Sequence, residues 1–182
     1  HAAELRTELG GFGLHGAFDA LGERLVGILN GIDQAAWNPA TDPWLPARFS
    51  AGDLTGKRRC RVALQQAFGL PQRDDVPIVA VCARVAAQKV YDLLLGSRAL
   101  ADEGTQFVFF GQGEERFRQA LAEQAAAAPH RIAARFDFGD VLEHLLLAGA
   151  DLCLMPSSYE PCGLTQMRAQ RYGTIPVAHR VG

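Results

Sequence analysis

The chain has 182 residues, a formal net charge of −2 and 48% hydrophobic residues, enough for about one domain with a buried core. The near-neutral charge argues against charge-driven binding to nucleic acid or to a membrane, and no run of about 18 apolar residues predicts a transmembrane helix. Four cysteines lie far apart without a Cys-x-x-Cys pair. They argue against zinc and against a disulfide framework, and together with the lack of a signal peptide they favour a cytoplasmic location.

Six short apolar runs predict β-strands, over residues 25–29, 78–82, 106–110, 131–136, 151–155 and 174–178. Five helical patterns occur in the same stretch, over residues 54–68, 90–101, 114–127, 141–148 and 163–171. Residues 38–52 have no periodicity and predict an extended surface loop. Alternating helices and strongly apolar strands predict an α/β fold with a doubly wound, mostly parallel, Rossmann-like sheet of about six strands. In such sheets ligands bind beyond the carboxyl ends of the strands.

Residues 151–171 combine an apolar strand, a carboxylate and a glycine that opens a helix. The free N–H groups of Gly163, Leu164 and Thr165 and the positive end of the helix form a favourable anion site. Glu160 lies just before that site, yet a carboxylate does not itself attract phosphate. The combination indicates a ligand with an anionic part and a hydroxyl-rich part, such as a sugar nucleotide.

Two cations follow the strand predicted at residues 78–82. Arg84 lies at the end of the strand and Lys89 opens the next helix. Such a pair can hold a pyrophosphate and neutralise the charge of a leaving group. The alternative is a pair of solvated surface cations, and the alternative for Glu160 is a helix-capping acid.

Other residues in this pattern have simpler interpretations. Gly111, in a Gly-Gln-Gly sequence after a strand, either approaches ribose or phosphate closely or forms a plain strand-to-helix turn. We interpret His144 as structural, and Trp37 and Trp44 as anchors of the loop.

Three blocks of sequence carry a family resemblance. They are Gly27–Asp33 with Trp37–Asp42, Arg84 with Gln88–Lys89, and Glu160–Gln166 with Arg171–Val177. Together they resemble bacterial glycogen synthases and plant starch synthases, which are retaining glucosyltransferases of the GT-B fold that use ADP-glucose. The blocks occur in the family's order and the similarity extends over nearly the whole chain. The resemblance implies that residues 1–182 form a single C-terminal nucleotide-sugar-binding domain, a fragment without the N-terminal acceptor domain.

The resemblance also implies catalytic roles. Arg84 and Lys89 would grip the nucleoside diphosphate and stabilise it as the leaving group, while Glu160 would orient the transferred glucose. One departure concerns Val90, because the family usually has glycine after the lysine; a β-branched residue there disfavours positive φ and predicts a weaker grip on phosphate. Broader GT-B relatives often have a second glutamate where this chain has Arg168, and the starch-synthase branch lacks it too.

The predicted binding set is larger than the catalytic set. Relatives carry an aromatic residue near the adenine at the position of Phe138, for which a core phenylalanine is the alternative. Cys162 would be a small residue lining the sugar pocket, because the family uses no catalytic thiolate. The predicted nucleotide- and sugar-binding residues are Arg84, Lys89, Gly111, Phe138, Cys162, Gly163, Leu164 and Thr165. No metal ligand and no cofactor are predicted, since the two cations supply the positive charge.

By resemblance, the parent enzyme transfers glucose from ADP-glucose to the non-reducing end of an α-1,4-glucan with retention, and releases ADP. The preference for adenine over uracil rests on the resemblance alone. Because a GT-B active site lies between two domains, we expect this chain to bind nucleotide, to transfer little or no glucose, and to self-associate through its exposed interdomain face. Two alternatives stay open: a GT-B enzyme with another donor or acceptor, and a non-catalytic nucleotide-binding or interaction module, which Val90 favours.

Overall fold

The computed structural model describes residues 1–137 and 139–181. Its strands are β1 (Ile78–Cys82), β2 (Gln106–Phe110), β3 (Ile132–Arg135), β4 (Leu152–Met155) and β5 (Ile175–Ala178). Its α-helices are α1 (His15–Ala20), α2 (Thr55–Ala67), α3 (Tyr91–Leu95), α4 (Glu115–Ala127), α5 (Asp140–Gly149) and α6 (Leu164–Arg171). Short 3-10 helices cover Glu4–Arg6, Gly22–Arg24, Ala87–Lys89 and Arg98–Ala101.

The five strands form one sheet in the order β3-β2-β1-β4-β5, and every pairing is parallel. This confirms the predicted α/β fold, and β3 lies at an edge as its weaker apolar pattern indicates. The chain moves outward from β1 to β3 and then returns to place β4 on the other side of β1. The order of strands therefore reverses between β1 and β4, and ligands bind at such a reversal in open parallel sheets.

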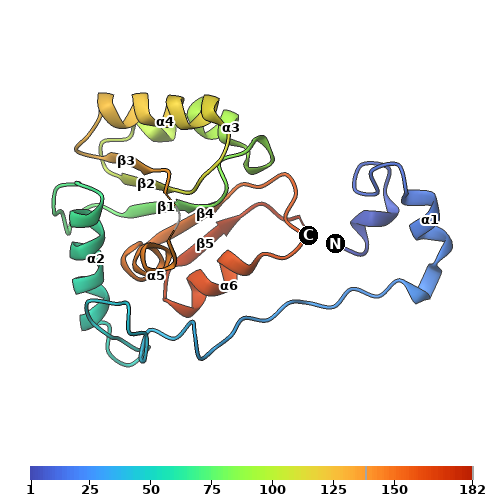
Figure 1. Ribbon diagram of the computed structural model, residues 1–182, viewed down its shortest axis with the longest axis horizontal. Coiled ribbons are helices and arrows are strands. Elements are labelled where there is room, and N and C mark those ends of the chain that lie inside the picture. The colour runs from blue at the N-terminus through green and yellow to red at the C-terminus, as the bar shows by residue number, and fades with distance from the viewer. Residues whose placement is uncertain (138, 182) are drawn as a thin grey trace.

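Helices cover both faces of the sheet (Figure 1). One core lies between the sheet and helices α2, α5 and α6, and includes the fully buried residues Leu64, Leu147 and Tyr172. The other lies between the sheet and helices α3 and α4, with Tyr91 and Leu121 at its centre. Burial on both faces explains why the central strands read as continuous apolar runs.

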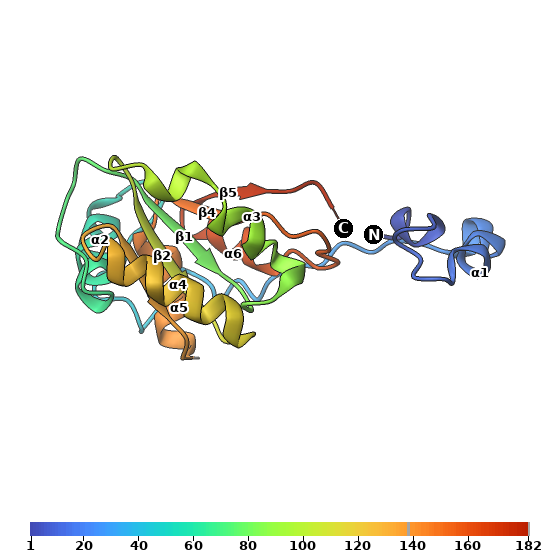
Figure 2. The same cartoon turned by 90° about the horizontal axis from the view of Figure 1, so that it is seen from above.

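The strand predicted at residues 25–29 is absent, so the sheet has five strands instead of six. This segment is an extended connection that runs from the N-terminal helical segment to the body of the domain, and no described strand pairs with it (Figures 1 and 2). Ile28 and Leu29 are 89% and 97% exposed. A β-prone run becomes a strand only when a neighbouring backbone supplies hydrogen bonds, and here none does.

The loop over residues 38–52 is only partly a surface loop, because Leu45 and Phe49 enter the core. Its Asp42 carboxylate is buried, and it accepts hydrogen bonds from Tyr172 Oη (2.5 Å) and His144 Nδ1 (2.7 Å). Trp37 stacks on His144 with ring centroids 3.8 Å apart. These contacts agree with a structural His144 and with Trp37 as a loop anchor.

The helix predicted over residues 90–101 is divided in two. Helix α3 ends at Leu95, and Ser97 then adopts an extended conformation in which its side chain accepts a hydrogen bond from Ala99 N. Serine competes well for such local bonds and therefore starts a new helical turn instead of continuing the old one. Among the described helices, none is long and apolar enough to cross a membrane.

Candidate functional site

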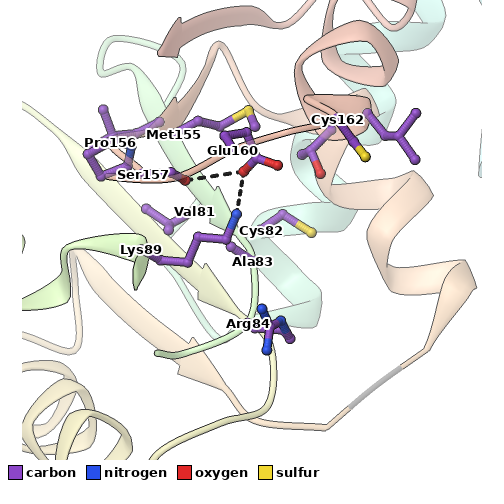
Figure 3. A pocket seen from close by; sticks show the side chains of 13 residues that line it. Val81, Cys82, Ala83, Arg84, Lys89, Met155, Pro156, Ser157, Glu160 and Cys162 are labelled. Atoms are coloured by element: carbon purple, nitrogen blue, oxygen red, sulfur yellow. Dashed lines mark hydrogen bonds and ion pairs between the residues drawn. The ribbon is translucent and has the colours of Figure 1, made fainter. Parts of the chain in front are cut away.

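A cavity of about 210 Å³ lies where β1 and β4 end, beside the N-terminus of α6 (Figure 3). The carboxyl ends of the two strands meet here, at the reversal in strand order. Six of the residues predicted from the sequence line this one cavity: Arg84, Lys89, Glu160, Cys162, Leu164 and Thr165. The spatial convergence on which the sequence interpretation depends is therefore present.

Lys89 and Glu160 form an ion pair in this cavity, although 71 positions separate them in the sequence. Ser157 Oγ donates to the same carboxylate oxygen of Glu160 (3.2 Å), and Gly163 N donates to the other one (3.4 Å). Burial opposes ionisation of Glu160, but the Lys89 ammonium and these two donors outweigh it, so the pKa of Glu160 lies below its usual value. The site thus holds a fixed, ionised carboxylate.

Two loops hold Glu160 in place. Gln88 Nε2 donates to Tyr159 O (2.6 Å), and Ser158 N donates to Gln88 O (3.0 Å), so the loop after β4 is fastened to the loop after β1. Gly163 follows with φ 62° and begins α6, and a Cβ at this glycine would lie 2.4 Å from the side chain of Gln166. Glycine is the residue that accepts this left-handed turn.

Val90 also adopts a left-handed conformation, with φ 59° and ψ 38°. It connects the 3-10 turn Ala87–Lys89 to α3, and thereby sets the direction from which Lys89 reaches Glu160. The resemblance described above implies glycine at this position, and a left-handed backbone would account for such a preference. A β-branched side chain in this region is strained.

Arg84 belongs to the cavity of Lys89 and Glu160 and also to a second, adjoining cavity of about 600 Å³. Its guanidinium is exposed, and its Nη2 donates to Gln88 Oε1 (3.2 Å). Thr165 is a second wall residue shared by the two cavities. A ligand that occupies both spaces would therefore pass between Arg84 and the start of α6.

Gly111 lines the second cavity, and its backbone supports both interpretations made from the sequence. Its φ is 147°, and a Cβ here would lie 2.0 Å from Ala83 O. The close approach of two strand ends therefore requires the glycine, whatever the cavity holds. Phe138 lies outside the described residues, so its predicted role near the base stays a prediction.

Two neighbouring predicted positions, Gly163 and Cys162, differ in their access to solvent. Gly163 is buried and lines a neighbouring cavity together with Glu160 and Cys162, whereas Cys162 itself is exposed. Among described residues no group of three or more His, Cys, Asp or Glu side chains could hold a metal ion.

The sequence did not predict a role for Glu143 at the site, and it assigned Arg168 no role in binding. Arg168 Nη1 donates to Glu143 Oε1 (2.9 Å), and both side chains line the second cavity. Glu143 lies on α5 and Arg168 on α6. No local motif connects two charges 25 positions apart on different helices, so only the fold reveals the pair.

The arrangement combines four features at the carboxyl end of the sheet: two cations, an ionised carboxylate, and a helix N-terminus. The first N–H groups of that helix have no partner within the helix. Cations and N–H groups suit phosphate oxygens, and a carboxylate suits hydroxyl donors.

Comparisons with known proteins agree with this fold. Residues 64–182 match the family described as glycosyl transferases group 1. The chain therefore belongs to the group 1 glycosyltransferases. Within that family, it is 49% identical to a glycogen synthase of Anaeromyxobacter dehalogenans and 44% identical to one of Opitutus terrae, over the whole chain in both cases. These relatives confirm the resemblance to glycogen and starch synthases.

Solved structures extend the comparison. The catalytic domain of starch synthase IV from Arabidopsis thaliana, bound to ADP and acarbose, is similar over 100% of this chain and 38% of its own, with 39% identity and a TM-score of 0.91. Anabaena HepE in complex with UDP and glucose shares the fold over 92% of this chain and 42% of its own, with 20% identity and a TM-score of 0.61. The chain spans 38% of the length of the glycogen synthase from Anaeromyxobacter dehalogenans.

Proposed function

We propose that this chain is the nucleotide-sugar-binding part of a glycogen or starch synthase. The complete enzyme would transfer glucose from ADP-glucose to the non-reducing end of an α-1,4-glucan, with retention of configuration. The ADP bound to the similar starch synthase domain and the identity to glycogen synthases support this donor and this reaction.

The contact between Lys89 and Glu160 beside Arg84 is the observation that carries the proposal. We propose that the diphosphate binds between the two cations and the N-terminus of α6, where the positive charge stabilises it as it departs from the sugar. Glu160 would accept hydrogen bonds from glucose hydroxyls and oppose the positive charge that develops at the anomeric carbon. The departing phosphate oxygen would help to take up the proton of the acceptor.

Residues Leu164 and Thr165 would donate backbone hydrogen bonds to phosphate, and Gly163 and Cys162 would line the sugar side of the site. The second cavity, with Gly111 in its wall, would hold the nucleoside. We propose that no metal or other cofactor takes part, because Arg84 and Lys89 provide the positive charge that a metal otherwise supplies.

Calorimetric titration with ADP tests the binding role. We expect the 182-residue chain to bind ADP, and Arg84→Ala and Lys89→Ala each to weaken binding about tenfold or more, because each removes a charged hydrogen-bond donor to phosphate. Arg58→Ala is the matched control, since Arg58 is exposed on α2 outside the cavity lining. Equal affinity in all four proteins would contradict the proposed roles.

Two further measurements separate the alternatives. Titration with UDP beside ADP tests the donor, and tighter binding of UDP would favour a different group 1 enzyme. A glucan elongation assay tests the chain without its partner domain. We expect no elongation, because the acceptor site would lie on the part of the enzyme that this chain does not cover. An absence of any nucleotide binding would favour a non-catalytic module.

A further inference from the structure

Glu143 and Arg168 form a charged pair in the wall of the second cavity, whose lining does not include Lys89 or Glu160. The two cavities share Arg84 and Thr165. A nucleotide whose diphosphate lies between these shared residues therefore directs its nucleoside toward the charged pair. The sugar ring joined to the diphosphate is the first part of the nucleoside to enter that space.

The pair is held in one orientation by a stack of side chains. The Arg168 guanidinium lies over the Trp37 ring, 4.1 Å from its centroid, and Trp37 in turn stacks on His144. His144 is fixed by its hydrogen bond to the buried Asp42. The contact with the Trp37 ring and the hydrogen bond from Nη1 restrict the Arg168 side chain, so it holds Glu143 in a defined position at the cavity.

Glu143 retains capacity to bind a ligand. Its Oε1 accepts the hydrogen bond from Arg168, whereas its Oε2 has no hydrogen-bond partner among the described residues. The side chain is 16% exposed. The Glu143 carboxylate also influences Cys82, which lines both cavities. Burial is the main cause that raises the pKa of the Cys82 thiol, and the negative charge of Glu143 raises it further. A carboxylate only accepts hydrogen bonds, so it matches hydroxyl donors and repels phosphate.

We propose that Glu143 is a specificity-determining residue that accepts a hydrogen bond from a ribose hydroxyl of the bound nucleotide, and that Arg168 is its positioning residue. Ribose presents two adjacent hydroxyl donors, and carboxylates read ribose in this way at the ends of other parallel sheets. The site would therefore favour ribonucleotides over deoxyribonucleotides and exclude nucleotides phosphorylated on the ribose. This inference rests on the proposed function, because it requires the diphosphate to bind at Arg84.

The competing explanation is that the pair only fastens α5 to α6. Calorimetry with ADP, 2′-deoxy-ADP and 3′-deoxy-ADP distinguishes the two roles. We expect the wild-type chain to bind at least one deoxy analogue about tenfold more weakly than ADP, as for the loss of one hydrogen bond to a charged group. A purely structural link would leave the ratio of the affinities for ADP and its analogues at about one.

Variants then identify the residue that reads the ribose. In Glu143→Ala and Glu143→Gln we expect weaker ADP binding and an affinity ratio close to one. Arg168→Met should reduce the ratio as well, and Arg168→Lys should restore it in part, because lysine keeps the charge without the planar fork. Glu115→Gln is the control, since this glutamate is 78% exposed on α4. Thermal unfolding checks that each variant is folded.

The outcomes separate this inference from the function on which it rests. If the wild type binds ADP and both deoxy analogues equally, the ribose role is wrong while the nucleotide-binding role stands. The same holds if discrimination persists in both Glu143 variants. If the wild type binds no ADP, both proposals fail. The wild-type comparison needs no substitution, so a variant that does not fold leaves the test intact.

Discussion

Val90 occupies a backbone conformation that β-branched residues rarely adopt. Its φ of 59° brings Cβ close to the backbone, which costs about 1–2 kcal/mol relative to glycine's unhindered access to this region. We expect Val90→Gly to raise the free energy of unfolding by about 1 kcal/mol, because relief of strain exceeds the entropy that glycine loses on folding. Urea denaturation measures this change.

Val141→Gly is the matched control for that experiment, because Val141 is 53% exposed in the right-handed helix α5 and its replacement should destabilise. We also expect Val90→Gly to tighten ADP binding, since a relaxed turn lets Lys89 approach phosphate. Unchanged ADP affinity would show that Val90 does not limit the site.

Glu160 gives the site a pH dependence whose direction follows from its environment. Its pKa in the folded chain lies below the usual value of 4.5, because Lys89, Gly163 and Ser157 together outweigh the effect of burial. As the pH falls, Glu160 becomes protonated in the unfolded chain before it does so in the folded chain. Its contribution to the free energy of unfolding is therefore fully present above pH 4.5 and is lost as the pH decreases through the folded pKa.

Stability measured by denaturant titration between pH 6 and about pH 3 tests this expectation. The free energy of unfolding of Glu160→Gln should depend less steeply on pH over this range than that of the wild type. Glu115→Gln should keep the wild-type slope, because an exposed pair such as that of Glu115 contributes little. Parallel curves for the wild type and Glu160→Gln would contradict the ion pair.

At the scale of elements, Lys57 joins three helices. Its ammonium on α2 lies 3.0 Å from the carbonyl oxygens of Ala148, Ala150 and Tyr172 and from Thr174 Oγ1. The carbonyls belong to the ends of α5 and α6, where the helix dipoles are negative. One partly buried cation therefore contacts carbonyl oxygens at the ends of two helices, and it links α2 to α5 and α6.

We expect Lys57→Met to lower the free energy of unfolding by about 2–4 kcal/mol, because the buried carbonyl oxygens of Ala148 and Tyr172 lose the ammonium that donates to them, whereas Ala150 O keeps the hydrogen bond from Thr174 Oγ1. Arg58→Met is the control on the same helix, since Arg58 is exposed. Chemical denaturation provides both values. A loss no larger than that of the control would show that water replaces the ammonium without cost.

At the scale of the whole molecule, the sheet could be predicted because the apolar pattern of each strand lies within one short segment of sequence. The run at residues 78–82 is apolar at every position, and burial on both faces rewards such a run wherever it lies in a parallel sheet. The segment 25–29 has a similar pattern, yet it fails to form a strand because it has no strand to pair with. Pairing is a property of the fold and not of the segment.

The candidate site divides in the same way. The motif around Glu160 lies in one continuous stretch, so its residues and their placement beside Lys89 could be expected from the sequence. Glu143 could not be expected, because it meets Arg168 only when α5 and α6 pack side by side. Helix positions carry no local signal for a charge that faces a cavity built by other elements.

The N-terminal segment leaves apolar surface uncovered. The helical segment around α1 lies to one side of the sheet in both views, and the extended connection leads from it back to the body of the domain (Figures 1 and 2). Among residues 1–24 only Gly11 is buried, and Val26, Ile28 and Leu29 of the connection are 70–97% exposed. Exposed apolar surface of this kind promotes association. We therefore expect the chain to self-associate through this segment.

Sedimentation velocity over a concentration series tests that expectation. We expect the sedimentation coefficient of the wild type to rise with concentration, and that of the double variant Ile28→Ser, Leu29→Ser to stay nearly constant. Val141→Ser is the control, because it removes an exposed valine from the body of the domain and should leave association unchanged. If the double variant associates as strongly as the wild type, another surface is responsible. The strand β5, where Ile175 is 64% exposed, is then the next to test, because it is an outermost strand of the described sheet and such edge strands can pair with another chain.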